Sequence, residues 1–541
     1  IMSSDWSSDV CSSDLAVSNE PRNRGGVVAA GDAQTARAGA QLLRAGGNAV
    51  DAVVGAAFAA CVCEGPLISP AGAGLLLHGG AGRGFEVLDF FARVPGLGAR
   101  PERLDFFAVE VDFGGVTQTF HVGRGSAAVP GLLRGLLTAH GAHGRLPLAD
   151  VVAPARALAA GYVVSTAVVG VLRLLEPIYA LAPNVRRLAC TPDGGWTEEG
   201  DRQTNPGLGR LFESLARDAE ATLRAVEDDL VGTVGPAHQG LLSAEDLAAY
   251  APARRAPIAV PFADGAVLTP GPPSAGGGLV ALGLRLAERS GLAARAVGDH
   301  WAHLARVVAA VSRARAAGYD RRYAEVGFMD AFLADDAVDA AWRAQETIGA
   351  GRAERGLGST THVSVLDDEG GAASLTASNG EGCGHVLDGW GVHVNNFLGE
   401  EDINPHGFHA EPAGAPMMTM MAPTVFVKDG APVLALGSGG SNRLRSAVLQ
   451  GLLNHLAFGD APDAAVTRDR LHVEGDQLWF EAVQMHPDAA RALERAWPGA
   501  ARFDRQSMFF GGVHIAARED GAYFGAGDPR RDGAVCRADE V

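Results

Sequence analysis

Gly358-Ser359-Thr360-Thr361-His362-Val363-Ser364-Val365 is the stretch of sequence that decides the fold. Apolar and polar side chains alternate along it, and they alternate again over residues 373–378, after an Asp/Gly-rich turn. This pattern predicts a β-hairpin with one apolar face and one face of hydroxyl groups. If the hairpin is centred on Glu369, Thr360 lies opposite Ser378, within side-chain reach. Taken alone, these residues favour an ordinary half-buried hairpin.

The same register has a consequence for the histidine of this stretch. It pairs His362 with Thr376 and Ser364 with Ser374, so that the imidazole faces hydroxyl groups. We therefore expect His362 to pack or to form hydrogen bonds rather than to act as a general base. A slip of one residue would exchange the two faces, but only this register keeps the valines together.

The composition describes a chain that can bury a large core. Its 541 residues suffice for two or three average domains or for one large sandwich. The net charge is -18 and no Lys/Arg cluster is interleaved with aromatic residues, so we expect no nucleic-acid or membrane partner. No apolar stretch reaches the roughly 18 residues of a membrane helix. The cysteines lack a metal-type spacing and predict buried free thiols: Cys11, Cys61, Cys63, Cys190, Cys383 and Cys536.

The first residues stand apart from the rest. The run from Asp5 to Leu15 resembles a translated sequencing-library adapter, so residues 1–15 are interpreted as non-native and are left out of the fold. No credible signal peptide follows Ala16, which makes the cytoplasm the expected location.

Other segments have clear secondary-structure patterns. Strands are expected at 26–30, 88–91, 266–269, 391–396, 424–427 and 432–436, and helices at 35–45, 129–140 and 151–160. The middle of the chain, 201–344, is expected to be mainly helical, with 266–269 as its one strand. Asn48 is expected to cap a helix that is apolar nearly all round and therefore buried. The glycine-rich run 79–84 lacks the order of a dinucleotide loop and predicts a turn between strands.

Two segments beside the hairpin bear on chemistry. Residues 349–359 are rich in Gly, Arg and Glu without apolar periodicity, and we expect the chain to be cut there. Residues 437–442 turn from a strand into a helix that begins at Arg443. Backbone N–H groups at such a turn can hold a developing oxyanion, although a tight turn with Ser441 or Asn442 as helix cap explains the pattern equally well.

A metal site near the histidines of the loop 400–409 is not expected. His406 and His409 lie beside Glu400, Glu401 and Asp402, but the segment has the pattern of a loop and no further ligand spacing supports a site.

Taken in order, several motifs resemble the γ-glutamyltranspeptidase family of N-terminal nucleophile hydrolases. The matching features run from about Gly26 to Asp528-Pro529-Arg530, nearly the whole chain. They are Gly46-Gly47-Asn48-Ala49-Val50-Asp51-Ala52, Val129-Pro130-Gly131, Asp246-Leu247-Ala248-Ala249-Tyr250, Pro272-Pro273-Ser274, Thr360-Thr361-His362-Val363-Ser364-Val365, Asn395-Asn396, Ala422-Pro423-Thr424 and Gly437-Ser438-Gly439-Gly440-Ser441. One such motif would be noise, but the ordered set is specific.

The resemblance implies an α+β fold, a four-layer αββα sandwich, made as a precursor that cuts itself between Ser359 and Thr360. Residues 16–359 would form the large subunit and residues 360–541 the small catalytic subunit, together one αββα domain. The Thr360 hydroxyl would attack the Ser359 carbonyl, and the resulting ester would hydrolyse. The freed α-amine, with a reference pKa of about 7.7 to 8.0, would then act as base for the same hydroxyl. No cofactor and no metal are needed.

The family's site residues carry over only in part. By resemblance, Ser378 assists the nucleophile, and the N–H groups of Gly440 and Ser441 form the oxyanion hole. The substrate-binding positions implied are Arg93, Asn379, Glu381, Asn396, Glu400 and Thr419. The family's carboxylate-binding Arg is replaced by Phe91, with Arg93 two residues on, and its paired serines become Thr419 and Met420. Its Asn after the assisting residue aligns with Gly380, flanked by Asn379 and Glu381, and its acidic ligand for the substrate amine aligns near Glu400. The catalytic half is kept, whereas the glutamate clamp is rebuilt.

The function implied is a self-processing, Thr-dependent γ-glutamyltransferase or hydrolase. It would act through an acyl-enzyme on γ-glutamyl amides such as glutathione, with water or an amine as acceptor. A family amidohydrolase for glutaryl or β-lactam substrates stays open, and so does a non-catalytic binding member. The partners are then a small-molecule amide and the protein's own two subunits, and a homodimer also stays open.

Overall fold

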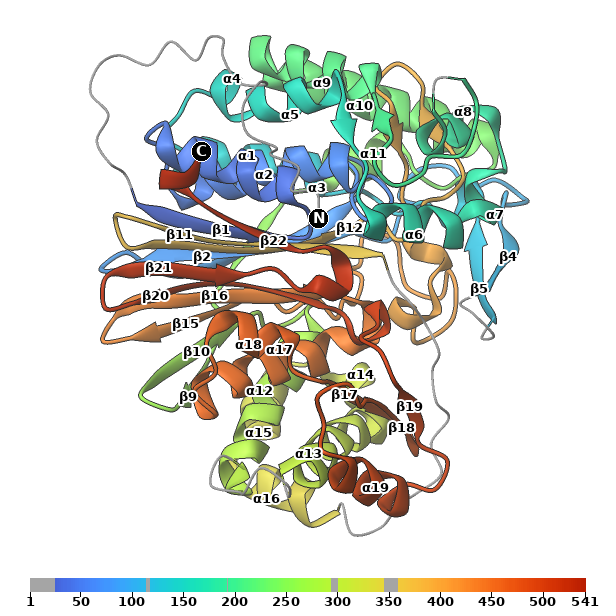
Figure 1. The fold of residues 1–541 in the computed structure, drawn as a ribbon. Helices are drawn as coiled ribbons and strands as arrows, with labels where there is room; N and C mark the ends of the chain where they lie inside the picture. Colours follow the sequence, from blue (N-terminus) through green and yellow to red (C-terminus); the bar gives the residue numbers. More distant parts are fainter. Residues whose placement is uncertain (1–24, 113–116, 192, 293–299, 345–358) are drawn as a thin grey trace.

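Two antiparallel sheets lie face to face, and helices cover the outer face of each (Figure 1). The computed structural model describes residues 25–112, 117–191, 193–292, 300–344 and 359–541. The expected adapter segment and most of the expected cleavage segment therefore lie outside the described residues. The strands β11 and β16, one from each sheet, pack against each other and join the two layers.

The first sheet has the order β22-β1-β11-β12-β2-β3-β8. Its strands are β1 (Gly26–Ala30), β2 (Ala73–Gly80), β3 (Gly84–Phe90), β8 (Ala253–Arg255), β11 (Thr360–Asp367), β12 (Gly371–Ser378) and β22 (Ala534–Arg537). The second sheet has the order β21-β20-β16-β15-β10-β9. Its strands are β9 (Ile258–Phe262), β10 (Gly265–Thr269), β15 (Thr424–Lys428), β16 (Ala431–Gly439), β20 (Gly512–Glu519) and β21 (Ala522–Ala526). The predicted hairpin thus lies in the middle of the first sheet.

The remaining strands form four small sheets apart from the two large ones: β4 (Phe107–Asp112) with β5 (Thr117–Val122), β6 (Tyr162–Val163) with β7 (Arg202–Gln203), β13 (Val386–Leu387) with β14 (Val392–His393), and β17 (Leu471–Glu474) with β18 (Gln477–Glu481) and β19 (Ala501–Phe503).

The helices follow the chain order in two groups. Those from the first half of the chain are α1 (Ala33–Arg44), α2 (Ala49–Cys63), α3 (Leu132–His143), α4 (Leu148–Val151), α5 (Ala153–Ala159), α6 (Thr166–Leu174), α7 (Glu176–Tyr179), α8 (Pro183–Arg186), α9 (Pro206–Arg217), α10 (Ala219–Val234) and α11 (Ala244–Ala249). The others are α12 (Ala275–Arg289), α13 (His300–Ala314), α14 (Asp320–Arg322), α15 (Phe328–Phe332), α16 (Asp335–Arg343), α17 (Leu444–Leu452), α18 (Pro462–Thr467) and α19 (Pro487–Ala496). Figure 1 shows the two groups on opposite sides of the paired sheets.

Helix α2 is the central helix against the first sheet. All of its residues are buried, and it contacts both β11 and β12. Asn48 caps it as predicted: its side chain accepts hydrogen bonds from the N–H groups of Val50 and Asp51, and the Asp51 carboxylate accepts one from the N–H of Asn48. A helix with no polar face must be covered on every side, and this one lies between the sheet and the helices α1, α3 and α5.

The middle of the chain departs from the prediction. The segment 253–269 contains three strands, β8, β9 and β10, instead of one. Strand β9 contains Pro261, a residue that argues against a central strand, but β9 lies at the edge of its sheet, where a missing N–H is tolerated. The predicted strand 391–396 is also wrong in extent, since only Val392–His393 pair. The ribbon of β4 and β5 was not anticipated.

A buried ion network holds the C-terminal segment in place. The Arg530 guanidinium contacts the carboxylates of Glu481 and Asp528, and all three side chains are fully buried. Asp528 also pairs with Arg470 and accepts a 2.9 Å hydrogen bond from the N–H of Val513 in β20. Each charge therefore has several partners, which is the condition under which burial of a charge is tolerated.

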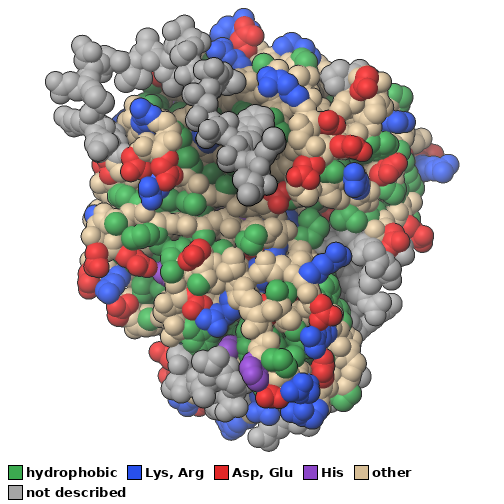
Figure 2. Space-filling model, viewed as in Figure 1, with side chains coloured by type: hydrophobic (Ala, Val, Ile, Leu, Met, Phe, Trp, Pro, Cys, Tyr) green, Lys and Arg blue, Asp and Glu red, His purple; other side chains and the backbone are tan. Residues whose placement is uncertain are grey.

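The surface and the thiols agree with the composition. On the face shown in Figure 2, basic and acidic side chains are interspersed rather than gathered by sign. In the part of the chain that the structure describes, the cysteines are free thiols, four of them buried, while Cys11 lies outside it. None of the helices found there is both long and apolar enough to cross a membrane.

Candidate active site

Thr360 is the first residue of strand β11, where the chain enters the first sheet. The register matches the prediction: Thr360 pairs with Ser378, His362 with Thr376, and Ser364 with Ser374. The Thr360 residue is only 5% exposed, and its carbonyl accepts a 3.2 Å hydrogen bond from Nη1 of Arg531. The pairing with Ser378 and the Arg531 guanidinium thus hold the backbone of Thr360 at the end of the first sheet.

The His362 ring is held by hydroxyl groups, as expected for a structural residue. Its Nδ1 lies 2.8 Å from the Thr376 hydroxyl and its Nε2 lies 2.8 Å from the Ser364 hydroxyl. Burial, together with the nearby His514, keeps the pKa of His362 well below its usual value. The imidazole is therefore neutral and occupied, which confirms that it hydrogen-bonds within the core.

Ser378 links the strand end to the residue that precedes Thr360. Its hydroxyl donates a hydrogen bond to the Ser359 carbonyl and accepts a 3.0 Å hydrogen bond from the N–H of Gly380. The Ser359 carbonyl is the group that a Thr360 hydroxyl would attack. A donor that already contacts this oxygen can stabilise negative charge that develops on it.

The glycine turn after β16 lies against the same strand end. A Cβ at Gly439 would come within 2.1 Å of the Thr360 carbonyl oxygen, so this position has room only for glycine. The turn continues through Gly440, with φ of 127°, and Ser441, with φ of 50°, an uncommon conformation for a residue with a side chain. The Ser441 hydroxyl donates to the Asp402 carboxylate, which holds the turn in this conformation.

A pocket opens at this end of the first sheet. It is lined by Phe91, Thr360, Ser378, Phe397, Glu400, Asp402, Ile403, Thr419, Met420, Met421, Ser441, Asn442 and Leu444. Thr360 therefore shares a pocket with Phe91, Thr419 and Met420, three of the positions at which the family pattern changes. Among the described residues that line it, none is Arg or Lys.

Three carboxyl groups meet at the pocket wall. Glu400 and Asp402 line the pocket, and Glu381 is buried beside them. Burial raises the pKa of Glu381 to about 8, with a further contribution from Asp402, and raises the pKa of Glu400 well above its usual value, helped by both neighbours. Oε1 of Glu381 and Oε1 of Glu400 are buried and have no hydrogen-bond partner among the residues that the structure describes. Buried acceptors of this kind favour a ligand that brings hydrogen-bond donors and positive charge.

Asn396 positions the loop that carries Glu381. Its Oδ1 accepts hydrogen bonds of 2.8 Å and 3.1 Å from the N–H groups of Glu381 and Gly382. Gly380 precedes this loop with φ of 60°, and a Cβ there would lie 2.2 Å from Asn396 Oδ1 and 2.4 Å from Glu400 Oε1. The close approach of these side chains leaves no room for the family's Asn at position 380.

Other residues expected at the site lie outside the pocket or face away from it. Arg93 bridges to Val129 and Pro416 through its backbone and is absent from the described lining of the pocket. Asn379 is buried, donates its N–H to the Leu67 carbonyl at 3.2 Å, and leaves its Oδ1 without a partner. In the nearby loop, His406 contacts Glu411, and Nε2 of His409 lies 2.9 Å from the Gly125 carbonyl oxygen.

Three further side chains at the site were not found from the sequence. Arg531 contacts the Thr360 carbonyl from 171 residues away, and Asp402 holds the Ser441 turn. Glu64, at the end of α2, accepts hydrogen bonds from the hydroxyls of Thr361 and Thr35. Burial raises the pKa of Glu64 to about 7. Of these three residues, only Asp402 lies close in sequence to a predicted substrate-binding residue, two positions after Glu400. That proximity was its only sequence signal.

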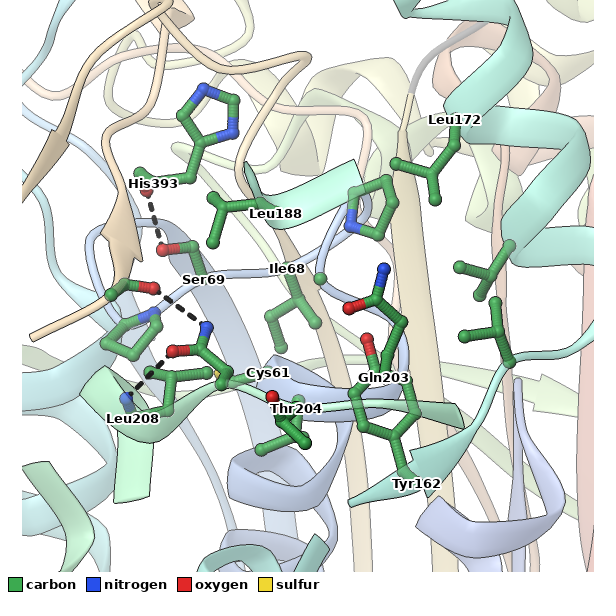
Figure 3. A pocket seen from close by; sticks show the side chains of 18 of the residues that line it. Cys61, Ile68, Ser69, Tyr162, Leu172, Leu188, Gln203, Thr204, Leu208 and His393 are labelled. Atoms are coloured by element: carbon green, nitrogen blue, oxygen red, sulfur yellow. Dashed lines mark hydrogen bonds between the residues drawn. The ribbon is translucent and has the colours of Figure 1, made fainter. Parts of the chain in front are cut away.

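A second pocket, shown in Figure 3, has a different character. It is lined in part by Cys61, Ile68, Tyr162 and Gln203, and it contains none of the predicted site residues. The Ser69 hydroxyl donates to the backbone carbonyl of His393 at 2.6 Å, as drawn in Figure 3. Burial and the neighbouring Glu64 carboxyl raise the pKa of the Cys61 thiol, so the pocket lacks a reactive nucleophile there.

The chain belongs to the γ-glutamyltranspeptidase family, because the family model described as Gamma-glutamyltranspeptidase matches residues 35–538. It is a family of N-terminal nucleophile hydrolases and acyltransferases. The chain is 28% identical to the Acylase ACY 1 proenzyme of Pseudomonas sp. (strain SE83), over 94% of this chain and 92% of that protein. It is 26% identical to the Glutathione hydrolase proenzyme of Escherichia coli (strain K12), over 94% of this chain and 91% of that protein. The fold is similar to that of a cephalosporin acylase from Bacillus halodurans, with a TM-score of 0.77, 22% identity, and coverage of 98% of this chain and 99% of that one.

Proposed function

We propose that the protein is a self-processing threonine amidohydrolase whose acyl groups carry a protonated amine. The observation that carries this proposal is the position of Thr360 at the start of β11, with the Ser378 hydroxyl on the Ser359 carbonyl. Attack of the Thr360 hydroxyl on that carbonyl forms an ester and frees the α-amine, and water then hydrolyses the ester. The same hydroxyl, with its own α-amine as base, then accepts the acyl group of a substrate amide and passes it to water or to an amine.

The pocket supports an amine-bearing acyl group. Glu400 and Asp402 line it together with Thr360, and an ammonium group would give Glu400 Oε1 a hydrogen-bond donor and would favour the ionised form of Glu400. The neighbouring lining residues Phe91, Phe397 and Met420 are apolar and suit the methylene chain of an acyl group. A γ-glutamyl group has the amine but also a carboxylate, for which the described lining supplies no Arg or Lys.

The names of the relatives do not identify the acyl group of the substrate, so the proposal rests on the residues of the pocket. They include proteins named as acylase and as glutathione hydrolase, at 28% and 26% identity. γ-Glutamyl amides, glutathione among them, therefore stay within the proposed substrate class, and the amine is the feature that the acyl groups share. A glutaryl group has a carboxylate in place of the amine and would meet the carboxyl groups of the wall.

Three anilides of equal chain length test this assignment: γ-glutamyl, 4-aminobutyryl and glutaryl. The first carries an amine and a carboxylate, the second only the amine, and the third only the carboxylate. We expect kcat/KM to be highest for the 4-aminobutyryl anilide, lower for the γ-glutamyl anilide and lowest for the glutaryl anilide. A preference for the glutaryl anilide would contradict the amine pocket. A processed protein inactive on all three would contradict the proposed acyl class.

A further inference from the structure

A second cluster of reactive side chains lies at the other end of the first sheet. Strand β2 pairs with β12 so that Ala73 lies opposite Ser378 and His78 lies opposite Ala373. His78 is therefore five residues along the strand from the catalytic end, about 17 Å at the usual rise per residue. Anything bound there acts on the fold and not on the atoms that react at Thr360.

Two strands and one helix bring this cluster together. His78 on β2 is the direct cross-strand partner of Glu86 on β3, so both side chains point to the same face. His143 is the last residue of α3, a helix that packs against β3. Its backbone carbonyl accepts a 2.7 Å hydrogen bond from Nδ2 of Asn48, which ties the end of α3 to the start of α2. No local sequence pattern marks the cluster, because His143 lies far along the chain from His78 and Glu86.

The distances within the cluster are those of a metal site. Nε2 of His78 lies 3.3 Å from Oε1 of Glu86, and Nε2 of His143 lies 3.0 Å from the same oxygen. The three ligand atoms all lie within 4.8 Å of one another. Zinc–ligand bonds of about 2.0 to 2.1 Å in tetrahedral geometry place neighbouring ligand atoms roughly 3.3 Å apart. In the part of the chain that the structure describes, this is the one group of three such residues.

An ordinary ion pair explains the cluster less well. The His78 side chain is 6% exposed, and its Nε2 forms no hydrogen bond with the residues that the structure describes. A buried imidazole nitrogen that lies beside a carboxylate and near a second imidazole is a geometry that a divalent metal ion can complete.

We propose that His78, Glu86 and His143 form a structural zinc site, with water as the fourth ligand. Two imidazoles and one carboxylate are a ligand set that suits Zn²⁺. The cluster borders an open cavity from which water and metal can enter. The ion would tie the β2–β3 hairpin to the end of α3.

The Arg254 side chain should weaken zinc binding at this site, so its removal should strengthen binding instead of weakening it. Nη1 of Arg254 lies 3.5 Å from Oε1 of Glu86, and its side chain is 54% exposed, so it can swing into solvent when a metal binds. Its positive charge weakens the attraction of a divalent ion. Arg254→Gln is therefore expected to bind zinc more tightly than the wild type does.

Zinc titration of the full chain tests the proposal. The protein carries no polyhistidine tag and is first freed of metal with a chelator, and zinc is then titrated in competition with a chromophoric chelator. We expect one equivalent of zinc to bind and to raise Tm, and affinity to fall at least about 10-fold in His143→Gln and in Glu86→Gln. His406→Gln is the matched control, because His406 pairs with Glu411 on an exposed loop without a third ligand, and it should bind zinc as the wild type does.

Spectra of the cobalt-substituted protein provide a second readout, since tetrahedral Co²⁺ absorbs strongly in the visible region. The band should be present in wild type and in His406→Gln and absent in His143→Gln. Failure of stoichiometric zinc to bind would overturn the proposal, and so would binding that His143→Gln and Glu86→Gln leave unchanged.

Discussion

Removal of the Ser378 hydroxyl should slow the cleavage before Thr360 without preventing folding. In Ser378→Ala, the Ser359 carbonyl loses the donor that would stabilise it as it becomes an oxyanion. Loss of one such donor costs roughly 10²- to 10³-fold in rate, about 2.7 to 4 kcal/mol. The N–H of Gly380 also loses its 3.0 Å acceptor, so stability should fall by about 1 to 3 kcal/mol.

Ser374→Ala is a control on the same strand. The Ser374 hydroxyl is buried, donates to the Leu436 carbonyl at 3.0 Å and accepts from the N–H of Thr424 at 3.0 Å. Its removal should therefore cost similar stability, but it does not contact the Ser359 carbonyl. Stability is compared by urea unfolding. Cleavage is measured on chains that are pulse-labelled during cell-free translation, as the fraction of labelled chain that remains intact over time. Equal cleavage rates for Ser378→Ala and wild type would refute the reasoning, and so would equal slowing in Ser374→Ala.

Three further substitutions test other parts of the account. Glu64→Gln should flatten the dependence of stability on pH. The folded-state pKa of about 7 lies above the unfolded value near 4.3, so the wild type should lose about 4 kcal/mol of unfolding free energy as pH rises between these values. In paired urea titrations the variant should not show this loss. Glu400→Gln should raise KM for the 4-aminobutyryl anilide by about 10-fold or more, because a charged hydrogen bond is lost, and leave the glutaryl anilide unchanged or improved. Arg530→Ala should lower the free energy of unfolding by about 3 to 5 kcal/mol, because it removes the ion-pair partner of the buried Glu481 carboxylate and leaves the buried Asp528 carboxylate with Arg470 alone. Removal of the exposed Arg224 should cost less than about 0.5 kcal/mol.

The hairpin could be predicted from the sequence because its information is local. The alternation of side chains and the turn around Glu369 determine the register, and the pairing of Thr360 with Ser378 follows from it. The cap at Asn48 is local in the same way. Strand β9 was missed for the opposite reason: Pro261 lowers its strand propensity, and only its place at the sheet edge makes the strand acceptable.

The pocket could be predicted only where the family pattern supplied the position. Phe91 and Thr419 were marked as changed positions and do line the pocket. Arg531 and Glu64 reach the hairpin from distant segments, and no local pattern marks them. The predicted strand 391–396 is shorter in the structure. The Asn395 side chain forms hydrogen bonds with the backbone of Ala71 and Ala128, and the chain leaves the strand pairing before this residue.

Intact-mass measurement of the purified full chain tests whether Thr360 is the nucleophile that cuts the chain. We expect two polypeptides from the wild type, the smaller beginning at Thr360, and a single uncut chain from Thr360→Ala. Thr360→Ser, which keeps a hydroxyl at the same position, should still be cut. A wild-type chain that stays whole, or a Thr360→Ala chain that splits at the same bond, would contradict the assignment of Thr360 as the nucleophile.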